Sequence, residues 1–177
     1  MKKLILLLLV LPMFIVGFGQ VKKKTRYKGV FKEEFYVLKE DKKIKHGHYL
    51  KTYNDILENP FIVEFGEYDN SLKNGIWFTF YYKDPGNSMR SVGYYKNGKK
   101  DSLWTYYYKD LNSGGDFTTM FSPNQKTKII YPEKGEIGFK IEFDTTNLTV
   151  SSTGTYKDDS KTGVWKYYTL GMLVHSY

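Results

Sequence analysis

The amino-acid sequence predicts an all-β protein, an elongated antiparallel sheet of stacked β-hairpins. One frame occurs three times, in residues 66–77, 93–104 and 154–165: Gly-x-Tyr, a polar stretch with Lys in the eighth place, Gly or Ser, an aliphatic residue and Trp. Each copy runs on into further aromatic residues, which favour strands, and no amphipathic helix of useful length is visible. Self-similarity at a period of 27 residues, from Gly66 to Gly93, is typical of repeat architectures whose units pack on their neighbours.

Each copy is predicted to form one hairpin, because a polar stretch of turn formers separates two strand-like runs. These stretches are Asp69–Asn74, Lys96–Asp101 and Lys157–Thr162. Gly in the first place suits a close approach of the backbone to a large ring. The positions that the frame assigns to structure are Gly66, Tyr68, Gly75, Trp77, Gly93, Tyr95, Trp104, Gly154, Tyr156, Gly163 and Trp165.

Alternation along the strands places the aromatic residues on two faces. The face with the three Trp residues is uniform between copies, so we expect a ladder of packed Trp rings there. The other face varies from copy to copy, which leaves packing and ligand binding open for it. Its aromatic residues form the candidate binding face, since exposed rings stack on sugars and make protein interfaces. These residues are Phe78, Phe80, Tyr82, Tyr107 and Tyr168.

The Gly-x-Tyr, Gly-x-Trp and Tyr-Tyr elements of this frame together resemble the MORN-repeat family. The similarity is to its bacterial variant, whose members often carry the label YwqK-family antitoxin, and it covers roughly residues 35–109 and 148–177. The resemblance implies an elongated sheet of stacked hairpins and a role in contacts with proteins or membrane surfaces. It implies no catalytic residues.

The repeat domain is expected to span residues 31–177, with copies near 38–53, 66–82, 93–108 and 154–168. The first is a worn copy within Phe31–Tyr53, in which Lys45-His46-Gly47-His48-Tyr49 aligns with 73–77, and it is expected to cap one end of the sheet. The period fails after the second full copy. We interpret the irregular insert, 109–147, as a diverged repeat with a polar loop at Leu111–Gln125 and strands at Thr127–Tyr131 and Ile137–Phe143. A loop enlarged in this way could carry a function of its own.

Residues 1–19 are typical of a secretory signal peptide. Met1-Lys2-Lys3 precedes the apolar run Leu4–Phe18, and Gly17-Phe18-Gly19 offers small residues before a cut at Gln20. The run is short for a membrane-spanning helix, and an uncleaved membrane anchor is the alternative. The chain has no Cys, which excludes a lipid-anchored lipoprotein, disulfides and thiolate metal sites. We therefore expect an exported protein, in the periplasm, at the cell surface or secreted.

Basic residues gather after the predicted cut, in the segment 20–30, which we expect to be a solvated tail. The alternative is a weak contact with an anionic surface through Lys22, Lys23, Lys24 and Arg26. Without Lys2 and Lys3, 25 basic residues remain against 19 acidic ones, a net charge of +6. Nucleic acid is not an expected partner of an exported chain, although basic and aromatic residues together would otherwise suggest it.

The sequence shows no catalytic constellation, so we expect no enzyme activity, no cofactor and no metal. His46 and His48 would share a face of a strand, but a Zn or Cu site needs a third ligand, and only His175 or a carboxylate could supply it. Most carboxylates fall in turns, where turn formation explains them. Glu136 and Glu142 could be imagined as a glycosidase pair, but nothing fixes their separation.

The sequence thus favours an exported, non-enzymatic interaction or scaffold module, monomeric or weakly dimeric, that acts through its aromatic-rich sheet. One alternative is a protein that binds glycans of the cell envelope, because aromatic rings stack on sugars. Another is an inhibitor of an exported toxin, which follows only from the label of the family that the chain resembles.

Overall fold

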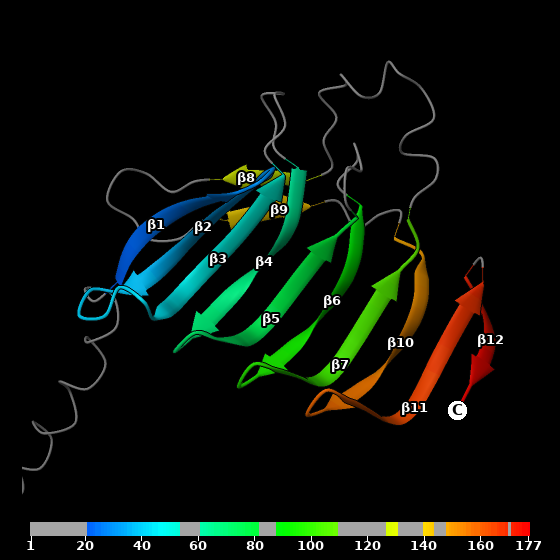
Figure 1. The fold of residues 1–177 in the computed structure, drawn as a ribbon. Helices are drawn as coiled ribbons and strands as arrows, with labels where there is room; N and C mark the ends of the chain where they lie inside the picture. Colours follow the sequence, from blue (N-terminus) through cyan, green and yellow to red (C-terminus); the bar gives the residue numbers. More distant parts are fainter. Residues whose placement is uncertain are drawn as a thin grey trace, which may run out of the picture.

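The computed structural model describes residues 21–53, 61–81, 88–109, 148–169 and 171–177, and the backbone of two short strands at 127–130 and 140–143. Within these ranges the chain is all-β, as the sequence predicts, and ten strands form one antiparallel sheet whose order follows the chain. Figure 1 shows them side by side from β1 to β12, with the turns of β4–β5, β6–β7 and β10–β11 along one end. They are β1 (Val21–Lys28), β2 (Phe31–Leu38), β3 (Lys45–Tyr53), β4 (Phe61–Asp69), β5 (Leu72–Phe80), β6 (Met89–Lys96), β7 (Lys99–Tyr107), β10 (Val150–Lys157), β11 (Ser160–Thr169) and β12 (Met172–Ser176).

Each full copy of the frame is one hairpin with a two-residue turn. The central turn residues have positive φ in all three copies: 47° and 67° at Asn70 and Ser71, 51° and 82° at Asn97 and Gly98, and 49° and 69° at Asp158 and Asp159. A type I′ turn requires positive φ at both positions, which Asn, Asp and Gly tolerate best. The predicted hairpins are therefore confirmed, and their turns are tighter than the six-residue polar stretches suggested.

A bulge follows each turn, at the same place in every copy. Between the pairs Phe65↔Phe78 and Glu67↔Asn74, Gly66 alone faces the three residues 75–77. The shift recurs in β6–β7 after Gly93 and in β10–β11 after Thr153. Bulges of this kind bend a strand and redirect its side chains. They lie between the Lys and the Trp of each copy, and so they set how these two side chains meet.

Successive hairpins join in a constant register. The N–H of the second turn residue donates to the carbonyl of the repeat Lys one hairpin earlier: Ser71 to Lys45 at 2.8 Å, Gly98 to Lys73 at 2.8 Å, and Asp159 to Lys100 at 3.0 Å. The third bond spans the break in the period, because β10 pairs directly with β7. Residues 109–147 are thus an insertion between two neighbouring hairpins, and the expectation of a diverged repeat within the stack is wrong.

The described residues of the insertion are two strands outside the main sheet. β8 (Thr127–Ile130) and β9 (Lys140–Phe143) pair only with each other, which confirms strands in the two predicted ranges. The predicted loop Leu111–Gln125 lies outside the described residues.

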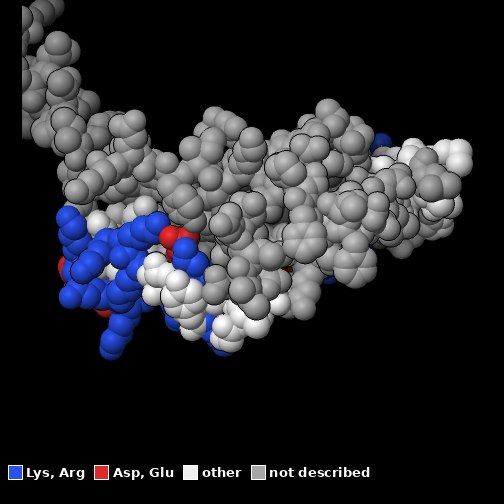
Figure 2. All heavy atoms as spheres, turned by 90° about the horizontal axis from the view of Figure 1, so that it is seen from above, with Lys and Arg blue, Asp and Glu red and all other residues white. Residues whose placement is uncertain are grey.

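The structure also corrects the prediction for the basic segment. Residues 21–28 form strand β1, which pairs with β2 from Val21↔Leu38 to Lys28↔Phe31, and they are not a solvated tail. Figure 2 shows the basic side chains gathered at this end of the sheet. β1, and not the hairpin within 31–53, is therefore an edge strand, and its charge opposes edge-to-edge pairing.

Two buried carboxylates explain why such a basic strand joins the sheet. Glu33 and Glu34 on β2 are almost fully buried. Arg26 and Lys23 on β1 form ion pairs with Glu33 and Glu34 respectively, and Lys32 also reaches Glu34. A buried charge must be paired, so β1 supplies charges that β2 requires.

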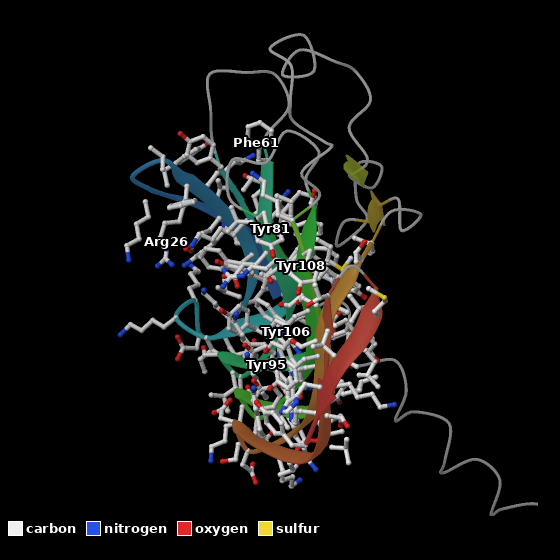
Figure 3. All side chains as sticks on the ribbon, turned by 90° about the vertical axis from the view of Figure 1, so that its right-hand side faces the viewer. Arg26, Phe61, Tyr81, Tyr95, Tyr106 and Tyr108 are labelled. Atoms are coloured by element: carbon white, nitrogen blue, oxygen red, sulfur yellow. The ribbon has the colours of Figure 1, made fainter. Side chains whose placement is uncertain are left out.

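Apolar side chains are buried on both faces of the sheet. We call the face that carries Trp77, Trp104 and Trp165 the Trp face, and the other the opposite face. The cluster on the Trp face consists of Phe35, Val37, Tyr49 and Trp77 with Tyr68 and Tyr95 packed against it. The cluster on the opposite face consists of Leu50, Ile62, Phe80 and Met89 with Phe65, Phe78, Val92, Tyr107 and Leu148 packed against it. Figures 1 and 3 show β8 and β9 on the opposite face, away from Arg26.

None of the described ranges contains a helix long and apolar enough to cross a membrane. The predicted signal peptide, residues 1–19, lies outside these ranges.

Candidate functional site

An aromatic ladder crosses the Trp face, perpendicular to the strands. From Tyr68 to Trp165 its rings alternate between the Tyr and the Trp of the frame, so that each Trp meets Tyr rings and not another Trp. Neighbouring rings contact edge to face, at centroid distances from 5.1 Å for Tyr156–Trp165 to 6.1 Å for Trp104–Tyr156. The ladder consists of Tyr49, Tyr68, Trp77, Tyr95, Trp104, Tyr156 and Trp165.

Each Trp of the ladder is fixed by the frame. The three indoles are 0 %, 2 % and 3 % exposed, and each lies directly on the first Gly of its copy. A Cβ added to Gly66, Gly93 or Gly154 would overlap the ring of Trp77, Trp104 or Trp165. Each indole N–H donates to the carbonyl of the residue after that Gly, at 3.0–3.1 Å. The expected close approach of Gly and Trp is confirmed in all three copies.

The Lys in the eighth place covers the Trp of its own copy. The ammonium nitrogens of Lys73, Lys100 and Lys161 lie 3.9, 4.3 and 4.2 Å from the ring centroids of Trp77, Trp104 and Trp165. In the worn copy, Lys45 lies 4.8 Å from the Tyr49 ring. Cation–π contacts of this kind are worth about 0.5–2 kcal/mol each, depending on desolvation. The Lys recurs in the sequence frame, but alternation along the strand does not place it over the Trp.

Polar groups complete this face. Lys100 and Lys161 donate to the hydroxyls of Tyr106 and Tyr167 at 2.8 and 2.9 Å, whereas Lys73 pairs with Glu64 at 2.9 Å. Burial raises the pKa of Tyr68 and of Tyr95 to about 12, and burial lowers the pKa of Lys45. On the Trp face, the aromatic rings and the lysines therefore contact one another.

The opposite face carries an exposed row of apolar side chains near the turns. Ile76, Leu103 and Val164 stand immediately before the Trp of each copy and are 57 %, 60 % and 62 % exposed. Tyr94, which pairs with Ile76, lies between the first two and is 38 % exposed. We call these four residues the apolar row. They occupy strands β5, β6, β7 and β11.

The row becomes polar toward β3. His48 and Glu67 are direct cross-strand partners at the equivalent place on β3 and β4, and His48 Nδ1 lies 3.2 Å from the Glu67 carboxylate. His46 Nδ1 lies 3.2 Å from Asp69. No group of three potential His, Asp or Glu metal ligands occurs among the described residues. The two histidines thus each face a carboxylate on the next strand.

The structure revises part of the candidate binding face. Phe80 is buried, and Phe78 stacks on Phe65 at 4.5 Å and packs against the same cluster. Tyr107 also packs there, and burial raises its pKa. These three rings therefore contribute to the core. Tyr168 is different, because it lines a cavity on this face, and Tyr82 lies outside the described residues.

Further aromatic residues lie outside the apolar row, toward both ends of the strands. Figure 3 shows Tyr95 and Tyr106 toward the hairpin turns, and Tyr81, Tyr108 and Phe61 toward the other end. Tyr81 donates to the Tyr107 carbonyl at 2.7 Å, and Tyr108 to the Tyr168 carbonyl at 2.6 Å. Both hydroxyls thus reach past one strand, to β7 and to β11 respectively.

The apolar row could have been found in the sequence. The frame places an aliphatic residue in its eleventh position, and alternation assigns that residue to the face opposite the Trp. The candidate binding face was predicted from aromatic residues alone, which selected Phe78 and Phe80 instead. Their burial depends on Leu50, Ile62 and Met89, which come from other strands and are not visible in the local pattern.

No protein-family model, curated protein or solved structure matches the chain.

Proposed function

We propose that this chain is an exported, non-enzymatic repeat protein that binds another protein through the apolar row. The observation that carries the proposal is the exposure of Ile76, Leu103 and Val164 at one repeated place. Ile76, Tyr94 and Leu103 follow one another on β5, β6 and β7, and Thr155 on β10 separates them from Val164. Contiguous exposed apolar side chains mark interaction sites more often than single ones do. The row extends over strands held in fixed register, so little conformational entropy would be lost on binding.

The contrast with the Trp face supports this choice of surface. On the Trp face the rings are buried or covered by Lys, and the lysines bond to Tyr or Glu. The apolar row has no such cover in the described residues, and its members are large. A partner that lays an apolar segment across strands β5 to β11 would fit it. An exported toxin, the partner suggested by the resembled family, is one protein that could do so.

The test compares two triple variants of the purified chain. Ile76→Ser/Leu103→Ser/Val164→Ser removes the three aliphatic members of the row, and Tyr27→Ser/Val30→Ser/Met172→Ser removes exposed apolar side chains elsewhere. Proteins captured from an envelope extract are identified and quantified by mass spectrometry. We expect one species to be captured by the parent and by the second triple variant, and to be lost with the first. Equal capture by both variants would contradict the proposal, provided that both melt like the parent.

A further inference from the structure

A cavity opens on the opposite face where β7, β10 and β11 meet. Its volume is about 440 Å³, within the range of roughly 300–1,000 Å³ that small-molecule sites occupy. Two irregularities border it: the β10–β7 register shifts between Val150 and Ser152, and the β11–β12 register shifts between Tyr167 and Tyr168. Bulges bend strands away from a flat surface, which is consistent with a hollow at this place.

Two threonine hydroxyls form a polar part of the cavity wall, and their hydrogens are already used. Thr153 donates its single hydroxyl hydrogen to the Trp104 carbonyl at 3.0 Å. The contact of 3.2 Å between the Thr105 and Thr153 oxygens must then be donated by Thr105. Both hydroxyls therefore present only lone pairs to a ligand. They accept hydrogen bonds and cannot donate them, which suits ligand O–H and N–H groups and does not suit a carboxylate or phosphate.

The remaining wall consists of Thr149, Gly171 and the side chains of Leu148, Val150 and Tyr168. Leu148 packs against the apolar cluster of the opposite face, and Val150 lies beside it. The Tyr168 ring forms another side, and its backbone carbonyl accepts the bond from Tyr108. The N–H of Tyr108 also donates to the Thr149 carbonyl at 2.9 Å. One residue thus ties together the two segments that enclose the cavity.

Charge narrows the ligand class further. No charged side chain is among the described residues that line the cavity. Lys166 pairs in register with Thr153 on the same face, and it disfavours a cationic ligand nearby. A neutral ligand remains, with hydroxyl or amide donors for the threonines and C–H surface for Leu148 and the Tyr168 ring. Saccharides combine these features, and aromatic rings with a polar edge suit them.

We propose that this cavity binds one or two units of a neutral saccharide, with Thr105 and Thr153 accepting hydrogen bonds from its hydroxyls and Tyr168 packing against its ring. The site lies beside β10 and β11 and does not include the apolar row, so it goes beyond the function proposed above. Either proposal can fail while the other holds, because the variants that test them do not overlap.

The experiment follows the methyl resonances of Thr105 and Thr153 by NMR while the full chain is titrated with N,N′-diacetylchitobiose at millimolar concentrations. We expect saturable shifts at these methyls and at Val150. Thr153→Val keeps the shape but removes the acceptor, and it should weaken binding about tenfold, the equivalent of one hydrogen bond. Thr155→Val is the matched control, because the Thr155 hydroxyl donates to the Thr162 carbonyl and does not line the cavity. It should bind like the parent.

Val150→Phe provides a second variant that fills the cavity and does not depend on the threonine bonds. It should abolish the shifts while the chain keeps its melting temperature to within a few degrees. The proposal is overturned if the disaccharide causes no saturable shift in the parent, or if Thr153→Val and Thr155→Val bind equally well. It is also overturned if glucuronic acid, an anionic sugar, binds more tightly than neutral glucose, since the hydroxyls then act as donors.

Discussion

On the Trp face, the hairpins β4–β5, β6–β7 and β10–β11 repeat one set of contacts, whereas on the opposite face the same strands differ from copy to copy. Gly beneath Trp, Lys above Trp and a Tyr ring edge-to-face with Trp recur in each of these hairpins. The opposite face is packed at Phe80 and Met89, exposed at Leu103 and hollow beside Tyr168. Both faces belong to the same strands, so the difference lies in the side chains and in local register shifts.

The comparison shows that the contacts between hairpins constrain one face of the sheet and leave the other face free to vary. Stacking requires each hairpin to present the same contacts to the next, because every ladder ring must meet two neighbours. The Trp face meets this requirement with residues fixed in the frame. The opposite face is then free of it, and its residues can vary without disturbing the register between hairpins. Substitutions that act on one face only can test this division.

The largest expected effect is the loss of a ladder ring. Trp104→Ala should lower the free energy of unfolding by about 3–5 kcal/mol, since a buried large side chain is replaced by a cavity. For a domain of this size, that corresponds to a fall in melting temperature of about 10 °C. Thermal unfolding followed by circular dichroism provides the measurement. Tyr27→Ala, an exposed aromatic residue on β1, is the control and should melt like the parent. If Trp104→Ala melts at the same temperature as the parent, the assignment of the stabilising role to the Trp face is wrong.

The next effect concerns the Gly that lies under the ring. Gly93→Ala places a methyl group inside the Trp104 indole, and overpacking of this kind costs about 1–3 kcal/mol. A double-mutant cycle with Trp104→Ala separates this clash from the intrinsic preference of Ala for a strand. We expect the cost of Gly93→Ala to disappear when Trp104 is already Ala. If the cost is the same in both backgrounds, the Gly is selected for another reason.

The sequence predicted the parts of this structure that depend on local pattern. The polar stretch Lys96–Asp101 indicated a turn, and Gly93 indicated the approach of Trp104, because turn geometry and ring size act within one hairpin. β1 was missed, since a Lys-rich segment joins the sheet only when the buried Glu33 and Glu34 are known. The place of Lys100 over Trp104 was missed as well, because a bulge separates them and alternation alone does not describe it.

The sequence predicts which face of the sheet carries the candidate site, but it does not predict which residues on that face are exposed. Alternation correctly separated Phe78, Phe80 and Tyr107 from the Trp residues. Whether those rings are exposed depends on Leu50, Ile62 and Leu148, which approach from distant parts of the sequence. The cavity beside Tyr168 depends on two register shifts, and no sequence signal for them was apparent.

A smaller effect is expected from the lysines of the Trp face. Lys100→Met keeps most of the aliphatic stem but removes the contact with Trp104 and the bond to Tyr106. We expect a loss of about 1 kcal/mol in the free energy of unfolding. Lys99→Met is the same substitution at the adjacent, exposed Lys, and it should leave the free energy of unfolding almost unchanged. Urea unfolding of both variants distinguishes the two outcomes. Equal stabilities would show that the lysines serve solubility and not packing.

The smallest effect is expected on the opposite face, within the apolar row. Leu103 directly precedes Trp104 in the chain, yet its side chain is 60 % exposed. Leu103→Ser should therefore change the free energy of unfolding by no more than about 0.5 kcal/mol, the usual range for surface positions. Urea unfolding of Leu103→Ser, Ile76→Ser and Val164→Ser, each beside the parent, provides the measurement. If any of the three costs as much as Trp104→Ala, its side chain is packed in solution. The row would then belong to the core like Phe80, and the division between a stabilising face and a recognising face would not hold.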